Sequence, residues 1–209
     1  MAEIGIMGGT FDPIHNGHLM LGRQAYDEYG LDFVWFMPSG QPPHKKNRAV
    51  TDKADRCAMV RLALEGQPGF VFSEFEVSRD GNTYTARTLA LLKEAYPDHT
   101  FHYIIGADSL YEIETWYHPE SVLTGVPLLV AGREYDGEHA ALPEQIAYLR
   151  RKYGASIRVL HCLEMDVSSA DIRRAVGEGQ DISRFVPKAV EAYIRSRSLY
   201  QSRPNERQP

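Results

Sequence analysis

Short apolar runs alternate with stretches of helical periodicity along most of the chain. The apolar runs predict six strands, at residues 4–7, 33–37, 70–77, 101–105, 127–131 and 157–160. The helical stretches predict helices over residues 18–29, 51–65, 84–94, 143–153, 169–176 and 188–197. Gly30 suits the end of the first of these helices, and Thr51 suits the cap of the second. Strands that alternate with helices form βαβ units, so the sequence predicts an α/β fold with a doubly wound parallel sheet.

The predicted domain organisation is simple. The chain has 209 residues, which is within the range of one domain. Residues 1–200 carry the alternation without an internal repeat or linker, and we expect them to form a single domain. Residues 201–209 are polar and end the chain, so they are expected to be a disordered tail.

Composition narrows the class of protein. The chain is 43% hydrophobic and 24% charged, which is typical of a soluble globular protein. Its net charge of -5 argues against general nucleic-acid binding. There is no apolar stretch of membrane length, and Glu3 and Asp12 interrupt the start of the chain. Cys57 and Cys162 form no CxxC pair. We therefore expect a cytoplasmic protein with reduced thiols and no nucleic-acid or membrane partner.

The stretch GGTFDPIHNGH, residues 8–18, follows the first predicted strand. Gly8 and Gly9 allow a sharp turn and the close approach of a ligand. Gly17 leaves the first amides of the next helix uncovered, and such amides bind anions. His15 and His18 are three residues apart, so both can point to one side and donate hydrogen bonds to phosphate oxygens. The stretch therefore predicts a phosphate-binding corner, although GxGxxG and GxxxxGK[ST] motifs are both absent.

Simpler interpretations compete with this one. The glycines can serve a turn alone, and His18 can be an ordinary helix residue. The two histidines can also bind a metal ion, for which Asp12 is the nearest third ligand. The coincidence of a glycine turn, a helix start and two imidazoles at the carboxyl end of a strand favours phosphate binding.

GGTFDPIHNGH resembles GGxFDPxHxGH, the HxGH signature of the nucleotidylyltransferase superfamily, at every fixed position. The resemblance implies a Rossmann-like fold and transfer of a nucleotidyl group from a nucleoside triphosphate to an acceptor. Pyrophosphate leaves, and no covalent enzyme intermediate is expected. His15 and His18 would be catalytic and would contact the phosphates of ATP. The resemblance also implies ATP contacts at Gly8, Gly9, Thr10 and Phe11.

A second stretch, VSSADIR at residues 167–173, resembles the superfamily's [I/V]SSTxIR signature. On the residues alone, Ser168 can cap the following helix with Asp171 as its capping-box partner. The resemblance adds that Ser168, Ser169 and Arg173 bind ATP, with Arg173 also catalytic. Ala170 departs from the threonine that is common in the family, which removes one hydroxyl contact to the phosphates.

Three further stretches resemble nicotinate mononucleotide adenylyltransferases. FMPSGQPPHK (36–45) fits FxPxxxPPHK, residues 84–89 fit YTxxTL, and residues 106–116 fit GxDxxxxxxxW. Trp116 would stack on the pyridine ring, and amides near Thr85 and Tyr117 would hold its carboxylate. On the residues alone, Trp116 can equally be a core side chain and Asp108 a helix cap. The resemblance implies acceptor contacts at Lys45, Thr85, Asp108, Trp116, Tyr117 and Arg133, a catalytic Lys45, and ATP contacts at Gly106 and Asp108.

The reaction expected from these resemblances joins ATP and nicotinate mononucleotide, with Mg²⁺, into deamido-NAD⁺ and pyrophosphate for NAD biosynthesis. Three alternatives stay open. The acceptor can be nicotinamide mononucleotide or another phosphate, the fold can be a non-catalytic nucleotide-sensing module, or the histidines can serve a metal hydrolase. The sequence also leaves open whether copies of the chain form a homo-oligomer.

Overall fold

A computed structural model describes residues 1–40, 50–132, 141–161 and 167–201. In this part of the chain, six strands form one sheet in which every neighbouring pair is parallel. The order across the sheet is β3-β2-β1-β4-β5-β6. This is the strand order of a doubly wound Rossmann sheet, so the predicted fold class is confirmed. The strands are β1 (Glu3–Gly9), β2 (Phe33–Pro38), β3 (Phe70–Phe72), β4 (Thr100–Ile105), β5 (Leu128–Ala131) and β6 (Ile157–Leu160).

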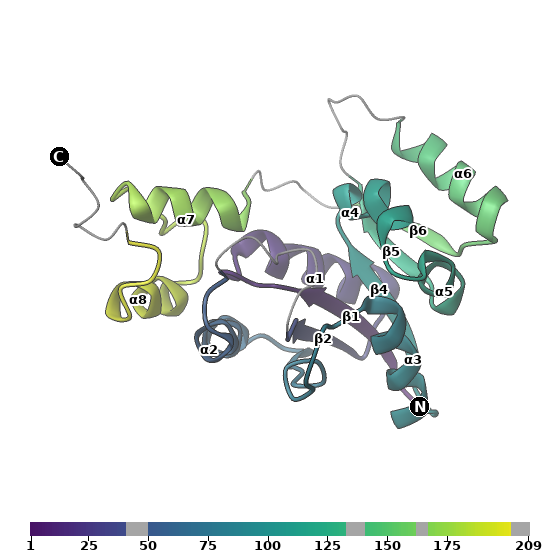
Figure 1. Ribbon diagram of the computed structural model, residues 1–209, viewed down its shortest axis with the longest axis horizontal. Coiled ribbons are helices and arrows are strands. Elements are labelled where there is room, and N and C mark those ends of the chain that lie inside the picture. Colours follow the sequence, from purple (N-terminus) through teal and green to yellow (C-terminus); the bar gives the residue numbers. More distant parts are fainter. Residues whose placement is uncertain (41–49, 133–140, 162–166, 202–209) are drawn as a thin grey trace.

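Helices cover both faces of the sheet (Figure 1). One face carries α1 (Asn16–Tyr29), α2 (Lys53–Leu64), α7 (Ser169–Gly177) and α8 (Lys188–Ser196), with α2 packed against α8. The other face carries α3 (Thr85–Ala95), α4 (Ala107–Glu112), the 3-10 turn η2 (Ile113–Thr115), α5 (Pro119–Gly125) and α6 (Leu142–Tyr153), with α3 packed against α5. Within the described ranges, no helix is both long and apolar enough to cross a membrane.

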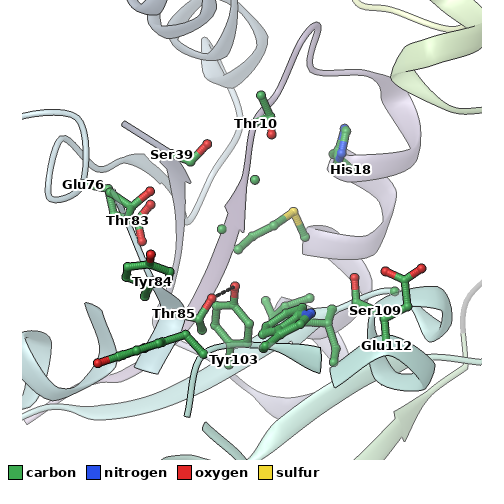
Figure 2. Close-up of a pocket in the computed structure, with 18 of the residues that line it drawn as sticks. Thr10, His18, Ser39, Glu76, Thr83, Tyr84, Thr85, Tyr103, Ser109 and Glu112 are labelled. Carbon is green, nitrogen blue, oxygen red and sulfur yellow. Dashed lines mark hydrogen bonds between the residues drawn. The ribbon is translucent and has the colours of Figure 1, made fainter. Parts of the chain in front are cut away.

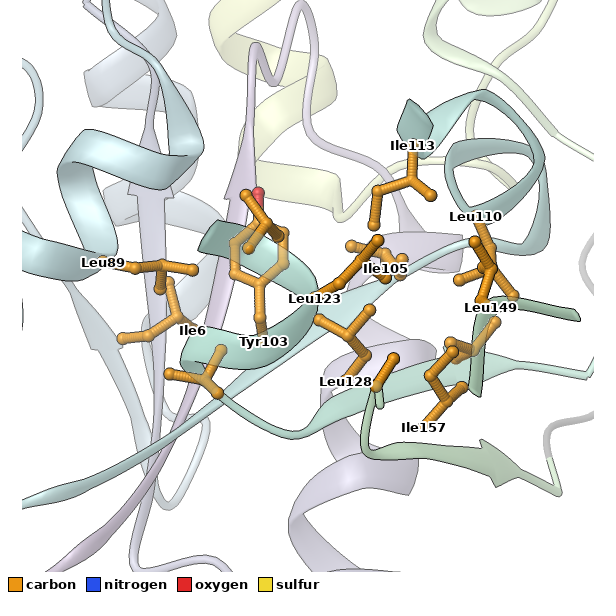
Figure 3. Close-up of a cluster of buried hydrophobic side chains, with 14 of the residues drawn as sticks. Ile6, Leu89, Tyr103, Ile105, Leu110, Ile113, Leu123, Leu128, Leu149 and Ile157 are labelled. Atoms are coloured by element: carbon orange, nitrogen blue, oxygen red, sulfur yellow. The ribbon is translucent and has the colours of Figure 1, made fainter. Parts of the chain in front are cut away.

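The core consists of two layers of buried side chains, one on each face of the sheet. Successive side chains of a strand point to opposite faces, so both layers draw on the same strands. In β4, Tyr103 and Ile105 belong to the layer under α3 to α6, while Ile104 belongs to the layer under α1 and α2. Figure 3 shows the first layer, where Tyr103 and Ile105 lie among side chains of α3, α4 and α5. Burial on both faces explains why the strands read as continuous apolar runs.

The structure corrects two of the predicted elements and adds two helices. The third strand ends at Phe72 rather than at residue 77, and residues 74–79 form turns closed by backbone bonds such as Ser78 N–H to Glu74 C=O (3.0 Å). α4 and α5 were not predicted, because helices of 6 and 7 residues show too few repeats of an apolar pattern.

The second corrected element is α2, at its start. Asp52, not Thr51, is the N-cap, and its side chain accepts a hydrogen bond from the Ala54 amide (2.7 Å). The Thr51 amide instead donates to Asp12 (3.2 Å). The predicted tail, residues 201–209, lies outside the described residues except for Gln201.

Candidate active site

A cavity of about 470 Å³ opens at the carboxyl ends of β1 and β4. The strand order reverses between these two neighbours, and ligands of open α/β sheets bind at such switch points. Figure 2 shows His18 of α1 on one side of the cavity, Glu76 and Thr83 on the other, and Tyr103 with Thr85 below. The volume is in the usual range for small-molecule sites.

The structure describes predicted site residues from four separate stretches of the chain, at residues 8–18, 85, 106–117 and 168–173. Eight of them line the cavity: Gly8, Gly9, Thr10, His18, Thr85, Gly106, Trp116 and Tyr117. Six others are described but do not line it: Phe11, His15, Asp108, Ser168, Ser169 and Arg173. The predicted Lys45 and Arg133 lie outside the described residues.

Gly8 and Gly9 do not form the tight turn that the sequence predicted. Both belong to β1 and pair with Met37 and Pro38 of β2. Their lack of a side chain serves close packing instead, because a Cβ on Gly8 would lie 2.9 Å from the Tyr103 hydroxyl oxygen. Phe11, just beyond β1, adopts a left-handed backbone conformation with φ of 49°. Non-glycine residues rarely occupy this region, so the chain stores strain at the mouth of the site.

The rings of Phe11 and His15 both pack against the ring of His18. The buried Phe11 ring meets the His18 ring edge to face, with the ring centroids 5.0 Å apart. The His15 and His18 rings lie 3.7 Å apart at their centroids. The backbone N–H of His15 donates to His18 Nδ1 at 3.3 Å. Since Nδ1 accepts, a neutral His18 carries its proton on Nε2, which makes Nε2 a hydrogen-bond donor.

Burial keeps both imidazoles neutral. It lowers the pKa of His15 to about 4, and it lowers the pKa of His18 well below its usual value, with the neighbouring His15 adding to the effect. Within the described part of the chain, the buried Nδ1 of His15 has no hydrogen-bond partner. The neutral His18 is therefore suited to donate a hydrogen bond from Nε2 to a phosphate oxygen.

The second signature packs against the first, although more than 150 residues separate them. Ser169 Oγ donates to the carbonyl of Pro13 at 2.8 Å, and Arg173 Nη1 donates to the carbonyl of Asp12 at 2.5 Å. Ser168 caps α7 by accepting from the Asp171 amide, as the sequence predicted. The N-terminus of α7 therefore lies beside the loop that leads into α1.

Aromatic side chains form the other end of the cavity. Trp116 is half-buried, packs against the core and also lines the cavity, so it combines the two roles that the sequence left open. Its ring stands nearly perpendicular to that of Tyr103, at 84° and 6.4 Å. Thr85 begins α3, and the side chain of the preceding Tyr84 does not cap this helix. The Tyr84 ring instead packs against that of the exposed Tyr117, with the centroids 4.5 Å apart and the planes tilted by 34°.

Sequence analysis did not single out Tyr103, Glu76 or Glu112, which also line the cavity. Glu76 is buried and accepts a hydrogen bond from Thr88 Oγ1 at 2.6 Å. Burial raises the pKa of its carboxyl group. Tyr103 reads in sequence as one more apolar strand residue, and Glu76 falls in the predicted third strand, so no local signal marked either position.

Arg56 was also missed, although it joins the loops around the cavity. It is only 1% exposed and donates to the carbonyls of Thr10 (2.7 Å), Ser39 (2.9 Å) and Thr51 (3.1 Å). These carbonyls belong to the segments after β1, after β2 and before α2. A single guanidinium thus fixes three loops by hydrogen bonds, as its planar set of five donors allows. An arginine inside the apolar pattern of a predicted helix was the available signal.

Asp12 does not complete a metal site with the histidines. One of its carboxylate oxygens accepts from Tyr200 Oη at 2.8 Å, and the other accepts from the Thr51 amide. Among the described residues, no three His, Cys, Asp or Glu side chains are grouped as a metal ion would require. The Asp12 carboxylate therefore links residues 51 and 200 to the loop before α1.

Comparisons with known proteins agree with this geometry. The cytidylyltransferase-like family model matches residues 6–175. A probable nicotinate-nucleotide adenylyltransferase of Lachnoclostridium phytofermentans is 42% identical over 200 residues, covering 96% of this chain and 100% of the relative. A probable nicotinate-nucleotide adenylyltransferase of Neisseria meningitidis is 39% identical, covering 96% and 100%.

Solved structures share the fold. One is Plasmodium falciparum nicotinic acid mononucleotide adenylyltransferase complexed with NaAD, which is similar with a TM-score of 0.78 at 19% identity over 96% of this chain and 98% of that one. The matched family model runs from β1 into α7, and thus includes both segments that meet at the loop before α1. The chain belongs to the cytidylyltransferase-like family.

Proposed function

We propose that the chain transfers AMP from ATP to nicotinate mononucleotide, giving deamido-NAD⁺ and pyrophosphate for NAD biosynthesis. Full-length relatives at 42% and 39% identity are named for nicotinate-nucleotide adenylyltransferase activity. The observation that carries the proposal is the single cavity that runs from His18 to Trp116 and Thr85. One end offers donors for phosphates and the other an aromatic wall, which are the two chemistries that the reaction requires. The use of ATP fits the cytoplasmic location expected from the sequence.

The phosphates of ATP are assigned to the His18 end. The backbone of Gly8 and Gly9 lines the cavity without side chains, so a phosphate chain can lie against it. The Nε2–H of His18 and the first amides of α1 supply donors for oxygens that gain charge during the reaction. Arg173 and the N-terminus of α7 lie close to the same loop and extend the positive field.

The acceptor is assigned to the Trp116 end. The indole offers a flat face for a pyridine ring, and the uncapped first amides of α3 at Thr85 offer donors for its carboxylate. Tyr117 lines the same end. Lys45 and Arg133 remain proposals for phosphate contacts on the strength of their charge and the motifs in which they stand.

The chemistry is an in-line displacement at phosphorus. An oxygen of the acceptor phosphate attacks the α-phosphorus of ATP, a new P–O bond forms, and the bond from the α-phosphorus to the bridging oxygen breaks. Pyrophosphate leaves with the electron pair of that bond. Because both reactants are anionic, the protein must hold them together and neutralise charge rather than supply a nucleophile. A well-placed donor such as His18 contributes about 3 kcal/mol to such a step.

Mg²⁺ is proposed only as the companion of ATP, where it neutralises charge on the phosphates. The described residues offer no group of three acidic or imidazole ligands, so the ion would be held mainly by phosphate and water oxygens.

The test is pyrophosphate release from ATP and Mg²⁺ with nicotinate mononucleotide, with nicotinamide mononucleotide and without acceptor. Release that strongly favours the acid is expected. Release that favours the amide would keep the reaction and overturn the acceptor. ATP binding without release under any of the three conditions would contradict the enzymatic assignment and favour a nucleotide-sensing module.

A further inference from the structure

Tyr103 places a hydroxyl group at the acceptor end of the cavity. Its ring is buried in the core layer under α3, and only 7% of the residue is exposed. The hydroxyl lies against the end of β1, since a Cβ on Gly8 would approach its oxygen to 2.9 Å. Figure 2 shows this oxygen directed toward Thr85. The hydroxyl is therefore a polar group on a buried side chain of β4, and Tyr103 lines the cavity.

Among the described residues, the hydroxyl has one distant hydrogen-bond partner. Thr85 Oγ1 lies 3.5 Å from it, at the outer limit of hydrogen bonding. A phenol carries one donor and can also accept, so this contact leaves capacity for a second, shorter bond. Burial raises the pKa of Tyr103 to about 12, and the group therefore keeps its proton at neutral pH. Tyr103 thus presents a permanent O–H donor at this end of the site.

Trp116 sets the plane of a ring bound beside it. Because the indole and the phenol meet at 84°, a ring stacked on Trp116 stands perpendicular to the Tyr103 ring. A substituent in the plane of the stacked ring can then reach the donors at this corner. Those donors are the Tyr103 O–H and the first amides of α3 at Thr85.

The neutral hydrogen-bond donors matter for binding a carboxylate because the described lining of the cavity offers no cationic side chain of lysine or arginine. None of the described residues that line the cavity is a lysine or arginine, whereas Glu76 and Glu112 are acidic. A carboxylate at the acceptor end therefore depends on backbone amides and hydroxyl groups among the described residues. A hydrogen bond to an ionised acceptor is about twice as strong as one between neutral groups.

We propose that the Tyr103 hydroxyl is a specificity-determining group that donates a hydrogen bond to the carboxylate on the pyridine ring of the acceptor. It thereby favours the acid over the corresponding amide, whose neutral oxygen accepts a weaker bond. This inference rests on the proposed function, since it takes nicotinate mononucleotide as the acceptor.

The test compares Tyr103→Phe with the wild-type enzyme in steady-state assays with both mononucleotides. The change removes one oxygen and keeps the ring that packs in the core. We expect the KM for nicotinate mononucleotide to rise on the order of tenfold, as for a lost bond to a charged group. The KM for nicotinamide mononucleotide should rise less, while kcat and the KM for ATP stay within about twofold. The acid-to-amide preference should fall accordingly.

Tyr29→Phe is the matched control, because the Tyr29 hydroxyl also donates a single bond, to the Val159 carbonyl at 3.1 Å, but does not line the cavity. Its kinetics should match the wild type, and thermal unfolding should show both variants folded. An unchanged acid KM, or equal rises for acid and amide, would overturn the role of Tyr103 while leaving the enzyme assignment intact. No pyrophosphate release by the wild type with nicotinate mononucleotide would overturn the proposed function, and this inference with it.

Discussion

At the scale of residues, the residues around His18 determine the tautomer, position and charge of its imidazole. The His15 amide fixes the tautomer of His18, the Phe11 ring supports it, and burial keeps it neutral. A neutral donor of fixed direction can meet a phosphate oxygen without losing the hydration shell of an imidazolium. The single donor at Nε2 is therefore the group whose loss should matter most to the chemical step.

His18→Ala is expected to lower kcat by a factor on the order of 10²–10³, with a modest change in the KM for ATP. The physical reason is the loss of a donor whose hydrogen bond strengthens in the transition state. Steady-state pyrophosphate release would measure it, with His161→Ala as the control, since the His161 side chain is 86% exposed and does not line the cavity. Turnover near that of the wild type would contradict the role given to His18.

Trp116→Ala is expected to raise the KM for the acceptor on the order of tenfold and to leave the KM for ATP little changed, because only the acceptor would stack on the indole. Trp116→Phe keeps an aromatic face and should recover most of the acceptor affinity. If the acceptor KM is unchanged while the protein loses stability, Trp116 belongs to the core alone.

At the scale of elements, the cavity exists because separate segments are tied to one another by buried polar groups. Arg56 of α2 holds carbonyls in the loops after β1 and β2, and Arg173 of α7 holds the loop before α1. These bonds satisfy carbonyls that would otherwise be buried without partners, which is costly. The same bonds hold the loops after β1 and β2 and the segment before α2 in fixed positions relative to one another.

Arg56→Met is expected to lower the free energy of unfolding by about 3 kcal/mol, because several buried carbonyls lose their donor together. Urea unfolding would measure this change. Arg61→Met is the control on the same helix: Arg61 is about half exposed, pairs with the exposed Glu74, and should cost less than about 1 kcal/mol. Equal losses for the two variants would show that Arg56 does not tie the loops together.

At the scale of the whole molecule, the two core layers leave one edge of the sheet free for ligands. Helices cover both faces, so the carboxyl ends of the central strands are where groups from many segments can meet. This edge carries the histidine pair in a buried setting. The buried setting lowers the stability of the folded protein at low pH, since burial disfavours the protonated form of both rings.

Stability is therefore expected to fall as the pH falls from about 6.5 toward 4. Across this window His15 and His18 bind protons in the unfolded chain but stay largely neutral in the folded protein, because their pKa values are lowered there. For His15 the loss between pH 6.5 and 5 is about 2 kcal/mol. Glu76 acts in the opposite sense, because its raised pKa favours the folded state at lower pH. Urea unfolding at pH 7 and 5 should show a smaller loss for His15→Gln than for the wild type.

His118→Gln is the matched comparison for this pH effect, since the His118 side chain is 55% exposed. It should retain the wild-type loss of stability between pH 7 and 5. If His15→Gln also retains the full loss, the buried pair is not the source of the pH dependence.

The order of residues alone was enough to predict the class of fold and the family. Apolar runs buried on both faces appear directly in the order of residues, so the parallel sheet followed from the pattern, and the comparisons confirm the family that GGTFDPIHNGH and VSSADIR indicated. Short-range features such as the Ser168 cap were likewise visible, because they depend on neighbours in the chain. The roles given to individual site residues stay predictions that the experiments above address.

The contacts between residues far apart in the chain could be seen only in the folded structure. Gly8 is small because the Tyr103 hydroxyl lies beside it, Asp12 is occupied by residues 51 and 200, and Arg56 joins three loops. Each of these contacts joins residues far apart in the chain, and no local pattern of apolar and polar positions records them. A pattern of apolar and polar positions indicates which face of a helix or strand is buried. Which residue a side chain contacts on that face depends on how the elements pack.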